Sequence, residues 1–268
     1  MSEIIKEEMI DEDAIVLTIA DKIATIRLNN PAARNALSTS VMASIQEMLD
    51  DLHGSKEAHV VVLEAVGPVF CSGHNLKEII GIDREATMLE LFEQCSKMMQ
   101  SIVNLPKPVI AKVNGMATAA GTQLIASCDL AFASSTSTFA TPGVNLGLFC
   151  STPMVALSRN VSPKHAMEML LGGEFADAEQ AARIGLINYA VAEEDLDKTV
   201  LDYANRIASK SPLTVRTGKA AFYSQLTMPL DEAYAYTSRV MSENMQTLDA
   251  QEGISAFLEK RNPKWRGE

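Results

Sequence analysis

The chain has 268 residues, of which 47% are hydrophobic and 21% are charged, and its formal net charge is −11. This composition is typical of a globular protein and excludes intrinsic disorder and collagen-like structure. The acidic balance argues against a nucleic-acid binder, which usually carries a basic excess. It leaves room for a local basic patch that holds a phosphorylated ligand.

The N-terminal half alternates expected strands and helices. Two short strands at residues 14–20 and 22–28 form a predicted hairpin. Ser38 can cap a helix that runs to about residue 53, because apolar side chains recur along one face of it. Residues 59–65 form a continuous apolar run, typical of a strand buried on both faces. Further expected elements are a glycine-containing turn at 67–73, a Met-rich helix at about 83–104 and a strand at 109–113.

A helix near residues 121–127 and a strand at 130–133 continue this alternation, which implies a mainly parallel sheet with helices packed on it. The apolar stretch 116–133 carries Gln123 and Asp129, which indicates a buried element and not a membrane span. We expect an α/β core over residues 1–200 and a helical region over residues 201–268. After about residue 160, helical periodicity recurs at 163–171, 178–184, 194–209, 212–226, 230–244 and 249–260.

The four cysteines, at positions 71, 95, 128 and 150, form no C-x-x-C pair. A chain of this size does not need disulfides, so we expect reduced thiols in a cytoplasmic protein. Residues 1–13 are acidic and lack the basic start and apolar run of a signal peptide. The sequence contains no P-loop, G-x-G-x-x-G, G-x-S-x-G or H-E-x-x-H motif and no zinc-type spacing. We therefore expect no metal and no separate cofactor.

Two glycine-containing turns are the segments best suited to chemistry. The first, residues 70–78, follows a buried strand and contains Gly73. The second, residues 113–124, follows another buried strand, and its Ala120 and Gly121 would open a helix. One backbone N–H from each turn, aimed at one carbonyl oxygen, would stabilise an enolate or a tetrahedral anion. Taken singly, the first turn is equally well interpreted as a plain strand-to-helix turn, and the second is better interpreted as close helix–sheet packing.

Several weak motifs accompany the two turns in a fixed order along the chain. Together with the turns they resemble the crotonase (enoyl-CoA hydratase/isomerase) superfamily over nearly the whole chain. Residues 119–124 and 147–153 are similar to a narrower group within that family. The other matching segments are residues 31–37, 127–131, 139–142, 178–187 and 251–261.

The resemblance implies the crotonase, or ClpP-like, spiral fold of ββα units with a C-terminal helical trimerisation region. It also implies a homotrimer or a hexameric dimer of trimers, with no nucleic-acid or membrane partner, that acts as a lyase on acyl-CoA in fatty acid metabolism. The backbone N–H groups of His74 and Ala120 would form the oxyanion hole. Coenzyme A, as part of the substrate, would be contacted at five positions, the last two in this subunit or a neighbouring one: Arg34, Ser72, Lys77, Phe257 and Lys260.

This sequence departs from the family at two positions. Family hydratases use two glutamates, and the matching positions hold Gln123 and Gly143. Gln123 cannot carry a proton, and Gly143 has no side chain. His74 would replace them if its side chain carried the proton, or it would act only through its backbone. Cys150 would be a nucleophile if its pKa were lowered, and otherwise a small buried thiol.

Three functions remain open for a chain of this kind. The first is an acyl-CoA enzyme, nominally an enoyl-CoA hydratase/isomerase, that relies mainly on its oxyanion hole. Decarboxylation of a malonyl-type thioester fits this case, because loss of CO₂ makes an enolate without a base. The second is a hydratase whose water is held by Gln123. The third is a non-catalytic acyl-CoA binding or regulatory protein.

Overall fold

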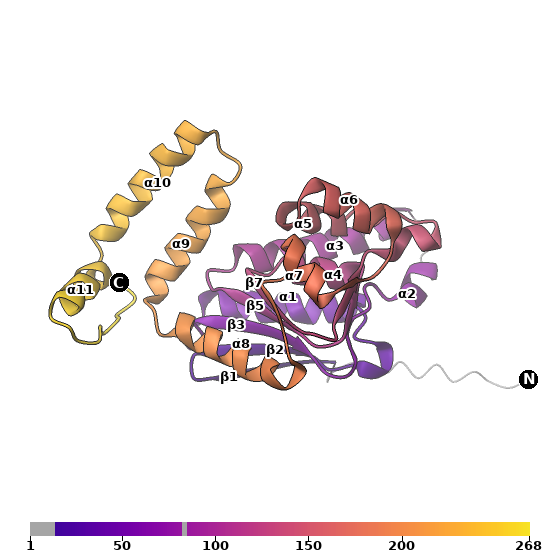
Figure 1. Ribbon diagram of the computed structural model, residues 1–268, viewed down its shortest axis with the longest axis horizontal. Helices are drawn as coiled ribbons and strands as arrows, with labels where there is room; N and C mark the ends of the chain where they lie inside the picture. Colours follow the sequence, from indigo (N-terminus) through magenta and orange to yellow (C-terminus); the bar gives the residue numbers. More distant parts are fainter. Residues whose placement is uncertain (1–13, 82–84) are drawn as a thin grey trace, which may run out of the picture.

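The computed structural model describes residues 14–81 and 85–268 (Figure 1). Its larger sheet has the strand order β1-β2-β3-β5-β7-β10. Strands β1 and β2 pair antiparallel, and the other neighbours pair parallel. The strands of this sheet are β1 (Ile15–Ala20), β2 (Ile23–Leu28), β3 (Val60–Ala65), β5 (Val109–Val113), β7 (Leu130–Ser134) and β10 (Tyr189–Val191).

Helices cover both faces of the larger sheet and then continue beyond it (Figure 1). The α-helices of the sheet-bearing part are α1 (Thr39–Gly54), α2 (Leu76–Ile80), α3 (Glu85–Asn104), α4 (Ala120–Ala126), α5 (Pro153–Asn160), α6 (Pro163–Gly172), α7 (Ala178–Ile184) and α8 (Glu193–Ala208). The 3-10 helices are η1 (Pro31–Ala33) and η2 (Pro142–Leu146), and the last α-helices are α9 (Pro212–Gln225), α10 (Leu230–Met245) and α11 (Leu248–Leu258).

Strand β3 explains how the two faces are built. Its Val60 and Val62 pack with α8 residues such as Leu196 on one face. The alternate residues Val61 and Leu63 belong to the main hydrophobic core with α1 and α3 on the other face. Because successive side chains of a strand point to opposite faces, a continuous apolar run is what a strand between two helical layers requires.

A smaller sheet with the order β4-β6-β8-β9 lies beside the larger one. Its strands are β4 (Val69–Cys71), β6 (Met116–Thr118), β8 (Thr138–Ala140) and β9 (Ala176–Asp177). Strands β4, β6 and β8 directly follow β3, β5 and β7, and they pair in the same order. This repeat of two strands followed by a helix confirms the predicted spiral of ββα units. It places the ends of β4 and β6, and the turns after them, side by side.

The last three helices form an arm, defined here as residues 211–268, that extends away from both sheets (Figure 1). A buried ion pair fastens α9 to the core, since Lys219 Nζ lies 2.7 Å from Asp129 Oδ2. The Tyr223 hydroxyl donates to the other oxygen of Asp129 at 2.9 Å. The predicted helical region is therefore present. The division predicted at residue 200 falls inside α8, which packs on the larger sheet, and it stays a prediction.

The longer elements agree with the sequence predictions, including the hairpin and the helix that follows Ser38. The helix predicted from about residue 83 begins at Glu85, and residues 82–84 lie outside the described residues. The prediction of a turn at 67–73 was wrong in part, because Val69–Cys71 forms strand β4. The sequence reading also missed β6, β8, β9, β10 and α5.

Within residues 14–81 and 85–268, none of the helices combines the length and the apolar character needed to cross a membrane.

Candidate functional site

The two glycine-containing turns meet where β4 and β6 end. These strands are parallel neighbours, with Cys71 in register with Ala117. Gly73 follows in the first turn with φ +91°, a conformation that glycine adopts without strain. A Cβ added at Gly73 would lie 3.1 Å from the Ala119 Cβ and 3.3 Å from the Ala120 nitrogen. The turns are therefore in direct contact, and a larger residue at Gly73 would push them apart.

Hydrogen bonds fix the first turn on both sides of His74. The Leu37 N–H donates to the Gly73 carbonyl at 2.8 Å, and the Asn75 N–H donates to the Leu37 carbonyl at 3.2 Å. One residue earlier, the Ser72 N–H donates to the Arg34 carbonyl at 3.1 Å. The His74 N–H itself donates to none of the described residues.

The second turn presents a matching group. Ala119 has φ +50° and ψ −116°, an unusual conformation for a residue with a side chain. Its N–H donates to the Ala140 carbonyl at 2.9 Å, and its carbonyl accepts from the Gln123 N–H at 3.0 Å. In the described part of the chain, the Ala120 N–H that follows has no acceptor. Two unengaged N–H groups thus lie on adjoining turns, one of them opening α4.

Helix α4 is packed too tightly to move away from this contact. All seven of its residues are buried. A Cβ on Gly121 would lie 2.2 Å from the Cys71 carbonyl oxygen, so the helix rests directly on β4. The Thr122 hydroxyl donates to the carbonyls of Ala117 and Ala140. These contacts hold the Ala120 N–H in a fixed direction.

The His74 side chain is enclosed and has no hydrogen-bond partner at either ring nitrogen among the described residues. It packs edge to face against Phe92 of α3, with ring centroids 5.4 Å apart. Burial lowers the pKa of His74, because the charged imidazolium loses its hydration. The ring is therefore neutral near pH 7 and offers one donor and one acceptor to a ligand.

Two further buried polar atoms lie on elements that adjoin this turn. The Gln123 side chain, on α4, is 4% exposed, and its Oε1 accepts no hydrogen bond from the described residues. Thr141 follows β8 and is fully buried, and its hydroxyl likewise has no partner there. Thr141 and Phe92 were not singled out in the sequence. Thr141 lies in the segment 139–142 that matched the family, which was the only signal for it.

The Gly143 position has no room for a side chain as the structure stands. A Cβ there would lie 2.9 Å from the Cys150 Sγ and 3.0 Å from the Leu148 carbonyl oxygen. Cys150 is buried, and burial raises the pKa of its thiol, because a thiolate would lose its hydration. A protonated thiol is a poor nucleophile, so the structure favours the small buried thiol over the nucleophile for Cys150.

Three of the predicted coenzyme A contacts surround the first turn. Arg34 is exposed and adopts a left-handed conformation with φ +54° at the end of η1. Its carbonyl is joined to Ser72, as described above, and Lys77 is exposed in the first turn of α2. Together they provide two exposed cations and a hydroxyl beside the turn that carries the His74 N–H.

Phe257 and Lys260 are not brought to the same place. Phe257 lies in α11 and is 82% exposed, and Lys260 follows the end of that helix with φ +55°. Figure 1 shows α11 at one end of the molecule and α2 at the other, with α4 in the sheet-bearing part between them. Within one chain, these two residues do not meet the turns around His74 and Ala120.

No group of three or more His, Cys, Asp or Glu side chains in the described ranges is arranged to hold a metal ion. Each of the four cysteines is buried and free.

The chain was compared with known families and proteins. Residues 18–268 match the family model described as enoyl-CoA hydratase/isomerase. The mitochondrial enoyl-CoA hydratase domain-containing protein 3 of Rattus norvegicus is 50% identical over 247 residues, which is 91% of this chain and 82% of the relative. The rat relative is a member of the narrower group that residues 119–124 and 147–153 resemble.

Solved structures agree with this similarity. The crystal structure of human enoyl-CoA hydratase domain-containing protein 3 has a TM-score of 0.92 and 48% identity, covering 94% of this chain and 100% of that one. An enoyl-CoA hydratase of Mycobacterium smegmatis has a TM-score of 0.93 and 44% identity, covering 95% of this chain and 99% of that one. The fold is therefore shared over nearly the full length of the chain.

Proposed function

The chain belongs to the enoyl-CoA hydratase/isomerase family, and we propose that it binds acyl-CoA thioesters and stabilises a thioester enolate with two backbone N–H groups. The donors would be the N–H groups of His74 and Ala120. The observation that carries this proposal is that both groups lack an acceptor among the described residues and lie on turns in contact at Gly73. A preorganised donor of this kind typically contributes a factor of about 10² to 10³ to kcat.

The proposal also assigns the coenzyme A end of the substrate. Arg34, Ser72 and Lys77 would meet it beside the first turn, since exposed cations suit phosphate groups. Phe257 and Lys260 would meet it from a neighbouring copy, because α11 lies far from the turns of its own chain. This assignment requires an oligomer, and we propose the homotrimer or dimer of trimers implied by the family resemblance.

The arm supports such an assembly. Ten of its large apolar side chains are exposed in the isolated chain, an amount that usually marks an interaction surface. Covering them with a second copy would remove this apolar area from water. These residues are Phe222, Leu226, Leu230, Tyr234, Met241, Met245, Leu248, Ile254, Phe257 and Leu258.

Proton transfer would have to differ from that of a hydratase with two glutamates. Gln123 and Gly143 stand at the two positions, and Cys150 fills the space beside Gly143 with a protonated thiol. Hydration would then depend on a water held by the unpartnered Oε1 of Gln123, with the neutral His74 ring as the remaining group able to exchange a proton. Undiminished hydration of crotonyl-CoA by a Gln123→Ala variant would exclude this route.

A second candidate reaction is decarboxylation of a malonyl-type thioester. The observation that favours it is that neither position 123 nor position 143 carries a carboxylate, so an anionic acyl group would meet no like charge there. In this reaction the bond between Cα and the carboxylate carbon breaks, CO₂ leaves, and the electron pair becomes the enolate. The two N–H groups would hold the enolate oxygen, and solvent would supply the proton to Cα.

The test is a panel of enoyl-, 3-hydroxyacyl- and malonyl-CoA esters, assayed for product by mass spectrometry and for binding by calorimetry. Turnover of one class identifies the reaction. Tight binding with no product would instead support a binding or regulatory protein, and absence of both would overturn the proposal. If the assignment is right, the structure of a crystal soaked with such an ester will show the thioester oxygen within hydrogen-bond distance of the His74 and Ala120 backbone nitrogens.

We also propose a cytoplasmic location, which rests on the four free, buried cysteines. The vertebrate relatives are named mitochondrial. Fractionation of cells that express the chain with a C-terminal tag distinguishes the two compartments.

A further inference from the structure

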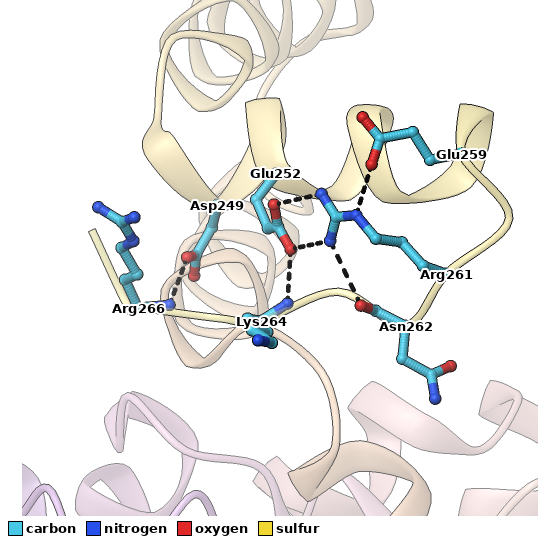
Figure 2. Close-up of polar contacts among 7 residues, drawn as sticks. All are labelled: Asp249, Glu252, Glu259, Arg261, Asn262, Lys264 and Arg266. Carbon is cyan, nitrogen blue, oxygen red and sulfur yellow. Dashed lines mark hydrogen bonds and ion pairs between the residues drawn. The ribbon is translucent and has the colours of Figure 1, made fainter.

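The last ten residues fold back along α11 and are fastened to it. We call residues 259–268 the tail. Figure 2 shows its polar contacts with α11. The Arg261 guanidinium makes two hydrogen bonds to Glu252, at 2.6 and 2.9 Å, and one to Glu259. The Lys264 N–H donates to Glu252 Oε1 at 2.7 Å. The tail is therefore held on the surface of the helix over most of its length.

Asp249 is the buried centre of these contacts. Its side chain lies in the first turn of α11, and the residue is 1% exposed. One carboxylate oxygen accepts from the Arg266 N–H at 2.7 Å, and the other accepts from the Gly267 N–H at 3.0 Å (Figure 2 draws the first). The second oxygen also accepts from the Ser211 hydroxyl at 2.5 Å. Asp249 thus joins the tail, α11 and the start of α9.

Trp265 also joins the tail to α11 and to the segment before α9. Its indole N–H donates to the Ser209 carbonyl at 2.8 Å, just before α9. Its ring lies against Gly253, where an added Cβ would come within 3.2 Å of two ring carbons. The buried Asp249 carboxylate, which accepts three hydrogen bonds, strongly restrains this short surface segment. The contact of Trp265 with Gly253 adds a second restraint. They fix the direction in which the end of α11 points.

The restraints fix the position of two exposed side chains at the end of α11. Phe257 is 82% exposed, and Lys260 is exposed directly after the helix. The tail holds four cations and two side-chain carboxylates, a local excess of +2 in a chain of net charge −11. An exposed aromatic ring next to the exposed Lys260 side chain suits a ligand that has both a flat base and phosphates.

We propose that Asp249 is a positioning residue, which locks the tail so that Phe257 and Lys260 are held ready for the phosphorylated adenosine end of coenzyme A. This inference rests on the proposed function, in which those two residues meet an acyl-CoA bound to a neighbouring copy. Asp249 touches no part of the ligand itself. It acts by removing the ordering cost that binding to a loose segment would carry.

The test compares two thioesters in binding to the full-length protein. Crotonyl-CoA carries the phosphorylated adenosine end, and crotonyl-pantetheine has the same thioester without it. An Asp249→Asn variant places an amide N–H against the N–H groups of Arg266 and Gly267 and should release the tail. Hydrogen exchange at those two amides measures the release. We expect the dissociation constant for crotonyl-CoA to rise about tenfold and that for crotonyl-pantetheine to stay unchanged.

Two more variants complete the experiment. Asp231→Asn makes the same change of charge at an exposed position in α10, and it should bind both thioesters like the wild type. Trp265→Ala opens the tail without touching Asp249, so it should reproduce the selective loss even if Asp249→Asn fails to fold.

Five results would overturn the assignment, and the last of them would also overturn the proposed function. A released tail with unchanged crotonyl-CoA binding, an unreleased tail, or an equal loss of both thioesters would each show that Asp249 does not position these groups. Wild-type protein that binds the two thioesters equally would show that the adenosine end is not recognised, while leaving the thioester site in place. Wild-type protein that binds neither would overturn the proposed function itself.

Discussion

The sheet-bearing core and the arm are stabilised in different ways. The core buries continuous apolar strands between two helical layers, as at β3. In the arm, all of which the structure describes, five residues are buried, namely Ser211, Ala221, Ala233, Asp249 and Ala256. Three of these are alanines, and the other two are hydrogen-bonded to each other. The core is therefore stabilised by hydrophobic burial within one chain, whereas the arm buries few apolar side chains in this chain and is held by polar contacts.

The two regions also differ in how their buried polar groups are satisfied. Around the turns of the core, His74, Gln123 and Thr141 have buried polar atoms without partners in the described residues. In the arm, Asp249 accepts three hydrogen bonds, and Lys219 is enclosed by Asp129 and two carbonyls. An unsatisfied buried polar group typically costs about 1–3 kcal/mol. Among the described residues the arm has one such atom, the Nδ2 of Asn244 in α10, so the unpartnered polar atoms gather mainly around the turns of the core, where a ligand could bind them.

The largest expected effect tests whether the arm depends on the core. A Lys219→Met variant keeps the length of the side chain but removes the buried cation paired with Asp129. We expect the free energy of unfolding to fall by about 3 kcal/mol, because the Asp129 carboxylate loses its counter-charge. Hydrogen exchange should show faster opening of α9–α11 than of the strands. Lys198→Met, which removes an exposed ion pair on α8, is the control and should leave the denaturation midpoint unchanged.

If hydrogen exchange in Lys219→Met shows the core and the arm opening together in one transition, the separation is contradicted, because the arm then unfolds only with the sheets.

The next effect tests the close packing of the core. A Gly121→Ala variant would place a methyl group 2.2 Å from the Cys71 carbonyl oxygen, so α4 must move away from β4. We expect a loss of about 2 kcal/mol in unfolding free energy, which is typical of an overpacked core. Ala120 directly precedes Gly121, so the Ala120 N–H should point away from the turn that contains Gly73. Thioester binding should then weaken together with stability. Calorimetric binding and urea denaturation measure the two effects.

If Gly121→Ala is less stable but binds thioesters as well as the wild type, the close packing of α4 on β4 is not needed for thioester binding.

A third effect concerns the pH dependence of stability at about pH 6.5, where histidine titrates, and the arm contains no histidine. Burial lowers the pKa of His74 below its ordinary 6.5, so the unfolded chain takes up a proton that the folded chain refuses. The free energy of unfolding should therefore fall as the pH decreases below about 6.5. A His74→Gln variant should show a flatter dependence over that range, measured by denaturation at several pH values.

The sequence predicted the long elements of the core because each carries its own signal. The apolar run of β3 and the capped, one-sided helix α1 are visible without tertiary context. Strands β4, β6 and β8 have three residues each and lie in segments with the composition of turns, so neighbouring strands decide their state. This is why the segments of β4 and β6 were predicted as turns.

The site divides in the same way. The turn glycine Gly73 and the absence of glutamates at positions 123 and 143 can be read from the sequence. The thiol of Cys150 beside Gly143 and the unpartnered Thr141 hydroxyl cannot, because they depend on how a loop packs in three dimensions. The link between Asp249 and residues 266–267 is likewise a property of the folded tail.

The smallest effect is the counterpart of Gly121→Ala in the arm. Gly218 lies within α9, and a Cβ there would meet nothing within 4 Å in this chain, beside a cavity of about 450 Å³ between α9 and α10. A Gly218→Ala variant should therefore raise the free energy of unfolding by about 0.5–1 kcal/mol, since alanine is the better helix former. If a second copy fills that cavity, the added methyl group would instead oppose assembly. Denaturation and sedimentation at several protein concentrations tell a more stable arm from a weakened interface.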